Sequence, residues 1–299
     1  MNADVVSHYK RVQYVLWIVL VLNWSVAAAK ILYGLLTRCS SMTADGFHSL
    51  SDGASNILGL VGAAICAKPS DADHPYGHKK YETLFALGIA GMIFFVAFNL
   101  VGQGISRLIN PVTPRIDIIS FITMIATMAV NFGVMKYEYK QGSVLKSDIL
   151  VSDSMHTRAD LFTSFTVIIA LIGAKLGWHH LDPIATLIIS VFIGYAAFDI
   201  VRHESGILCD ATAIGDIKKI EEIVLGIKGV KSCHKIRSRG RPDDIHLDLH
   251  VQLAPNTHLD KAHEISFLIE NTIKRQMPEV ADVLVHLEPV GKEDLHGRS

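Results

Sequence analysis

A series of long apolar runs occupies the first two thirds of the chain and constrains the fold more than any other feature. Half of the 299 residues are hydrophobic. Most of the runs reach the roughly 20 residues that an α-helix needs to cross the hydrocarbon core of a bilayer. They are Tyr14–Leu36, Thr43–Ala67, Thr83–Ile105, Asp117–Tyr137, Ile149–Leu176 and Pro183–Val201. The pattern predicts an α-helical membrane protein with six transmembrane helices.

The basic residues of the linkers indicate how these helices are oriented. Six spans place both termini on one side, where the linkers and helix ends hold nine Lys and Arg residues against four on the other side. The positive-inside rule then places both termini in the cytoplasm. We expect the protein in a bacterial inner membrane. The nine residues are Lys10, Arg11, Lys68, Lys79, Lys80, Lys136, Lys140, Lys146 and Arg202, and the four are Arg38, Arg107, Arg115 and Lys175.

Charge and cysteine content exclude several other classes of protein. The formal net charge is −1, so no polycationic surface suggests a nucleic-acid partner. The four cysteines form no CxxC pair, which argues against a disulfide framework and against a thiolate zinc knuckle. We interpret Cys39, Cys66, Cys209 and Cys233 as small, mostly buried apolar residues.

The last third of the chain has the pattern of a soluble α+β domain. Apolar residues at helical spacing run from Ile214 to Ile227. Strands are predicted over Val230–Arg239 and Asp244–Leu253, the second with strict apolar–polar alternation. An amphipathic helix over Leu259–Gln276 and a last strand over Ala281–Leu287 complete the order αββαβ. This order predicts helices on one face of a small sheet.

Two histidine–aspartate pairs lie inside the apolar runs. His48 and Asp52, like His156 and Asp160, are four residues apart, so each pair shares one face of its helix. Such groups are costly in hydrocarbon and usually face a bundle interior or a water-filled cavity. Two nitrogens and two oxygens suit a tetrahedral divalent cation, with zinc as the first candidate.

Three polar residues accompany these pairs. Asp45 and Asp153 each lie three residues before a histidine, and we interpret both as helix caps rather than as aids to ion passage. Asn56, one turn after Asp52, is interpreted as an interhelical hydrogen-bonding residue.

Two further histidine-rich segments are candidates for metal binding. In the linker after the second run, Asp71, His74 and His78 could chelate a cation, or could belong to a polar turn among lipid headgroups. In the soluble third, histidines and one glutamate are spread over neighbouring elements, which suits either a metal site or exposed polar positions. These residues are His234, His250, His263, His286 and Glu288.

Together these motifs resemble the cation diffusion facilitator family of proton-coupled divalent-metal exporters. The resemblance rests on Ala44–Asp52, Asp71–His78 and Ser154–Asp160. It implies a transport site of His48, Asp52, His156 and Asp160, a loop site, and cytoplasmic sites near a homodimer interface. It also implies a six-helix transport domain over residues 1–206, and a metallochaperone-like domain for metal binding and dimerisation over residues 207–299.

Two positions depart from the best-known bacterial pattern of that family. The position of His48 is often aspartate there, so the 2His-2Asp set resembles that of zinc-selective members. Imidazole ligands favour zinc or cobalt over harder ions such as manganese. Glu288 stands where the archetype has aspartate, and its carboxylate can still ligate.

These features predict a secondary transporter and not an enzyme. Metal binding requires neutral imidazole and ionised carboxylate, so protons are the expected counter-ions, with zinc both transported and regulatory. Cadmium, cobalt, iron or manganese are possible cargoes. The alternative is a membrane-anchored metal sensor or storage protein. A metalloenzyme is disfavoured, because no HExxH motif supplies a general base.

Overall fold

The computed structural model describes residues 2–37, 40–109, 118–175 and 181–291. Within these ranges it describes every side chain except those of residues 2–5, 33–37, 40–49, 51–52, 118–121, 123–124, 163, 166–175, 181–182 and 185. The chain divides into two compact units, residues 1–204 and 205–299. Each unit is described on its own below.

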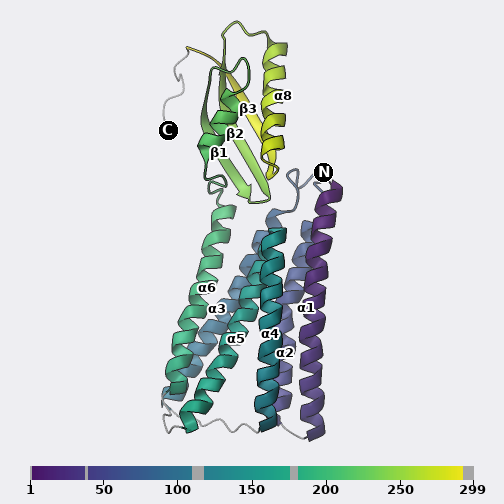
Figure 1. The fold of residues 1–299 in the computed structure, drawn as a ribbon, viewed down its shortest axis with the longest axis vertical. Helices are drawn as coiled ribbons and strands as arrows, with labels where there is room; N and C mark the ends of the chain where they lie inside the picture. The colour runs from purple at the N-terminus through teal and green to yellow at the C-terminus, as the bar shows by residue number, and fades with distance from the viewer. Residues whose placement is uncertain (1, 38–39, 110–117, 176–180, 292–299) are drawn as a thin grey trace. The chain divides into compact units, whose positions relative to one another are not determined.

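Six long helices make up the first unit (Figure 1). Among the described residues, three stretches are long and apolar enough to cross a membrane by length and composition: Val6–Leu32, Lys80–Ile109 and Thr186–Leu208. Apart from Ala67, the described residues of all six predicted spans fall on these helices, which confirms the predicted helical transmembrane domain; Asp117 and Leu176 lie outside the described residues. The helices are α1 (Asn2–Thr37), α2 (Ser40–Cys66), α3 (Lys80–Ile109), α4 (Ile118–Leu145), α5 (Asp148–Lys175) and α6 (Leu181–Leu208).

Small residues let three of the helices approach closely. A Cβ atom on Gly62 of α2 would lie 2.6 Å from the ring of Phe85 on α3 and 2.9 Å from Ile149 on α5. Ile149 is fully buried, and so are Ile89 and Ile93 of α3. Close backbone approach at small residues is the usual basis of helix packing in membranes. Helix α5 is therefore held firmly against α2 and α3.

The second unit has the order αββαβ, as predicted from the sequence. Its strands form one sheet in the order β1-β2-β3, with β1 antiparallel to β2 and β2 parallel to β3. Gly240 closes the β1–β2 hairpin with φ +108°, and a Cβ there would meet the Asp244 carbonyl oxygen. The elements are α7 (Ile217–Leu225), β1 (Ser232–Arg241), β2 (Asp244–Leu253), α8 (Leu259–Gln276) and β3 (Val280–Pro289).

Alternation along β2 separates the two faces of this sheet. Leu247, Leu249 and Val251 are buried in a core that also contains Ile220 of α7 and Ile269 of α8. The even-numbered residues of β2 are half-buried on the other face. Both helices thus cover one face, and the polar side chains of β2 lie on the opposite one.

Candidate metal centres

Of the two predicted histidine–aspartate pairs, the one whose side chains are described lies on α5. His156 Nε2 is 3.9 Å from Asp160 Oδ2, and the two side chains are 6% and 18% exposed. Neither ring nitrogen of His156 has a hydrogen-bond partner among the described residues. A buried polar group left in this state costs about 1–3 kcal/mol. Ligand atoms on a tetrahedral zinc lie roughly 3.3 Å apart, so a small closure would let both side chains bind one cation.

The other pair, His48 and Asp52, belongs to the helical backbone of α2. Their side chains lie outside the described residues. Asn56, one turn further along α2, is described and fully buried. Its amide nitrogen donates a hydrogen bond to the Asp153 carboxylate of α5, and its oxygen accepts one from Asn23 Nδ2 at 3.1 Å. The predicted interhelical role of Asn56 is confirmed, and the polar faces of α2 and α5 meet.

Asp153 is not a helix cap. It lies five residues inside α5, is fully buried and receives the Asn56 hydrogen bond. The cap interpretation is also wrong for Asp45, which lies inside the helical range Ser40–Cys66. A cap residue must precede the first turn to reach free backbone N–H groups, whereas α2 begins at Ser40 and α5 at Asp148, each five residues before the aspartate.

A buried glutamate that the sequence patterns did not predict completes the polar interior. Glu138 of α4 is fully buried and accepts a 3.0 Å hydrogen bond from Thr157 Oγ1. Thr157 also lines a small polar cavity together with Asp160 and Asn131. The sequence signal for this polar interior lies on α5, where the polar positions 153, 156, 157 and 160 have helical spacing and form one face. That face contacts α2 through Asp153 and α4 through Thr157.

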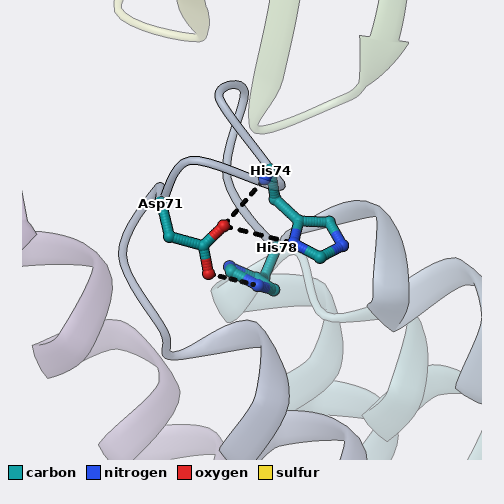
Figure 2. A group of neighbouring side chains, drawn as sticks. All are labelled: Asp71, His74 and His78. Carbon is teal, nitrogen blue, oxygen red and sulfur yellow. Dashed lines mark hydrogen bonds and ion pairs between the residues drawn. The ribbon is translucent and has the colours of Figure 1, made fainter.

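The loop residues Asp71, His74 and His78 do converge (Figure 2). Asp71 Oδ1 accepts the backbone N–H of His74 at 2.7 Å and lies 3.2 Å from His74 Nδ1, while Asp71 Oδ2 lies 3.5 Å from His78 Nε2. The His74 backbone hydrogen bond is the main cause that lowers the pKa of Asp71. An ionised carboxylate between two imidazoles is a chelating arrangement.

Second contacts fix which nitrogen of each loop histidine is turned toward Asp71. His78 Nδ1 lies 3.1 Å from the Pro69 carbonyl oxygen, to which an N–H there can donate. His74 Nε2 lies 3.2 Å from the Tyr81 hydroxyl. The nitrogens left for a cation are therefore His78 Nε2 and His74 Nδ1, because the partner of one ring nitrogen sets the state of the other.

On the open face of the sheet, Glu288 gathers three histidines. Glu288 Oε1 lies 2.7 Å from His250 Nδ1 and 3.7 Å from His286 Nε2, and Oε2 lies 3.2 Å from His234 Nε2. The hydrogen bond with His250 is the main cause that lowers the pKa of Glu288. Strand register explains the convergence, because His250 pairs with both His234 and His286.

His263 does not join this group. It lies on α8, which packs on the opposite face of the sheet, and its side chain is exposed. Within one chain, ligand atoms of His234, His250 and Glu288 lie within 4.8 Å of one another, and the largely exposed His286 approaches the same carboxylate.

Comparison with known proteins gives matches over nearly the whole chain. Residues 16–209 match the cation efflux transmembrane domain, and residues 215–290 match the cation efflux protein cytoplasmic domain. An uncharacterized transporter of Methanocaldococcus jannaschii is 30% identical, over 90% of this chain and 95% of its own. The cation-efflux pump FieF of Shewanella oneidensis is 28% identical, over 94% and 97%. The manganese efflux system protein MneP of Bacillus subtilis is 28% identical, over 92% and 95%.

Proposed function

Since this chain belongs to the cation efflux family, we propose that it exports zinc from the cytoplasm in exchange for protons. The proposed transport site is formed by His48, Asp52, His156 and Asp160. The observation that carries the proposal is the buried imidazole of His156, which has no hydrogen-bond partner among the described residues and lies one turn from a carboxylate.

The Asn56–Asp153 contact supports the pairing of α2 with α5 at this site. The two helices run in opposite directions. The predicted ligands precede the contact on α2 and follow it on α5, so both sets lie on the same side of the contact along the helix axes. At a rise of about 1.5 Å per residue, the backbone at position 52 lies about 6 Å from the contact along α2. The backbone of His156 lies about 4.5 Å from it along α5. The two HxxxD segments are therefore at the same depth.

Charge and protonation give the proposed exchange its chemistry. Two ionised carboxylates bring a formal charge of −2, which neutralises a divalent cation away from water. A ligating imidazole must be neutral, so cation loading releases protons and protonation releases the cation. Each ligand shifts the inward–outward equilibrium only by its different affinity for the two states. Cytoplasmic termini, supported by the positive-inside pattern, make this direction an export.

The ligand set favours zinc, although one relative is named for manganese. Two imidazoles suit a borderline ion better than a carboxylate-rich set would. The loop and sheet groups would bind zinc as a regulatory ion. A homodimer is expected through the cytoplasmic unit, which matches the family's cytoplasmic domain.

Flux into proteoliposomes with an acidic interior tests the proposal. The wild-type protein is expected to take up zinc faster than cadmium, cobalt, iron or manganese, and to lose uptake when the pH gradient is collapsed. Asp160→Asn should lose uptake while remaining folded. Asp199→Asn on α6, which makes the same change of charge, should retain it. Zinc transport by the Asp160→Asn protein would contradict the site, and zinc binding without any flux would support the anchored sensor.

A further inference from the structure

We propose that Asp148, His203 and Glu204 form a further divalent-cation site, distinct from the transport, loop and sheet groups. One ligand atom from each of these three side chains lies within 4.8 Å of the other two. Asp148 is the first residue of α5, and the other two lie near the end of α6. All three belong to the first compact unit.

A cavity beside the cluster gives a cation access to it. Its volume is about 570 Å³, and its walls come from α3, α5 and α6. Asp148, His203 and Glu204 line it together with apolar residues such as Met155 and Phe192. The three groups differ in burial: Glu204 is buried, Asp148 half-buried and His203 exposed. An ion could thus enter from the exposed histidine and meet the buried carboxylate last.

The donor set defines the class of ion. One imidazole nitrogen and two carboxylate oxygens suit a divalent first-row transition cation, and three protein ligands leave a position for water. The cavity also contains Arg158, whose guanidinium lies 5.4 Å from the Phe162 ring centroid. Arg158 is ten residues beyond Asp148, about 15 Å along α5. Its guanidinium therefore lies beside Phe162, further along the helix from Asp148.

Helix α5 separates this cluster from the transport site. One stripe of α5, formed by positions 148, 151, 152, 155, 158, 159 and 162, faces the cavity. The other stripe carries His156 and Asp160, and Asp148 lies about 12 Å along the axis from His156. A cation held between Asp148 and α6 would touch no transport ligand, yet it would tie α6 to the helix that carries two of them.

Counting bound Mn²⁺ by the loss of its free EPR signal tests the proposal on the purified full-length protein. The Asp148→Asn/His203→Asn variant is expected to bind one ion fewer per chain than the wild-type protein. Asp199→Asn, which alters a carboxylate of the same cavity outside the cluster, should bind the wild-type number. An unchanged number in the double variant, or the same loss in Asp199→Asn, would overturn the site.

Two further measurements separate this result from misfolding and from the transport site. His203→Asn alone changes an exposed side chain, and it should remove the ¹⁴N modulation of the one Mn²⁺ ion that the double variant fails to bind, without changing the elution volume. In an Asp160→Asn background, the double variant should again bind one ion fewer. A decrement that vanishes in this background would assign the lost ion to the transport site and refute the separate site.

Discussion

Replacing Glu288 by glutamine should weaken zinc binding by the sheet group of the cytoplasmic unit about a hundredfold. Glu288 is the one carboxylate in this group, and its oxygens lie 2.7, 3.2 and 3.7 Å from nitrogens of His250, His234 and His286. Glutamine keeps the size of the side chain but loses its charge and one acceptor oxygen. The substitution therefore isolates the ligand role of the carboxylate from its packing.

The size of the effect follows from the number of ligands. Four-ligand zinc sites in small domains have apparent binding free energies of about 10–16 kcal/mol. An equal share for one ligand is about 3 kcal/mol, which is roughly a hundredfold in Kd. Calorimetric titration of residues 207–299 at neutral pH would measure this change. The unit has its own core, so we expect it to fold alone.

Asp248→Asn is the matched control for this prediction. Asp248 lies on the same face of β2, two residues before His250, and pairs with Arg237 at 3.7 Å. An exposed pair of this kind contributes about 0–1 kcal/mol, so zinc affinity should change less than about fivefold. Equal Kd values for the Glu288 and Asp248 variants would refute the ligand role of Glu288.

The lowered pKa of Glu288 also determines how the stability of the cytoplasmic unit changes with pH. A carboxyl whose folded-state pKa is below its ordinary value stabilises the fold fully above that ordinary value. The contribution is lost as the pH falls through the lower, folded-state pKa. Zinc binding requires neutral imidazoles in addition to the ionised carboxylate, whereas the fold draws on the carboxylate alone. Zinc binding should fail on acidification before the fold of the cytoplasmic unit does.

Three other predictions concern single side chains. His48→Asp should shift the flux ratio from zinc toward cadmium or manganese, and an unchanged ratio would show that His48 does not set cargo choice. Burial raises the pKa of the Cys233 thiol to about 11, so maleimide should label exposed Cys209 and spare Cys233 in the native cytoplasmic unit. Thr157→Val should lower the free energy of unfolding by about 1–3 kcal/mol. Thr186→Val, whose buried hydroxyl has no partner among the described residues, should not lower it.

The sequence predicted the elements of the cytoplasmic unit best where one periodicity ran without interruption. The alternation over Asp244–Leu253 and the amphipathic pattern over Leu259–Gln276 both match the observed bounds. The first helix of this unit begins at Ile217 rather than Ile214, because Gly215 and Asp216 precede it and Asp216 occupies the N-cap position. Ends depend on such local backbone choices, which hydropathy does not record.

The sequence predicts which strand histidines share a face of the sheet, but it does not predict on which face the helix that carries His263 packs. His234, His250 and His286 occupy paired positions on neighbouring strands, so alternation places them on one face. His263 lies on a helix whose buried residues, Ala262 and Ile265 among them, pack against the other face. Spacing along the chain gives the face of each element, but the side on which a helix docks is a tertiary choice.

The buried polar residues of α5 show a limit of a different kind. The HxxxD motif places His156 and Asp160 on one stripe of this helix, whereas Asp148 begins a second stripe that contains no such motif. Aspartate in a first turn is also typical of any helix, because it complements the N-terminal dipole. Asp148 becomes a candidate metal ligand only because His203 and Glu204 of α6 lie close to it in the structure. Because Asp148, His156 and Asp160 belong to one continuous helix, a cation bound at either stripe would contact α5.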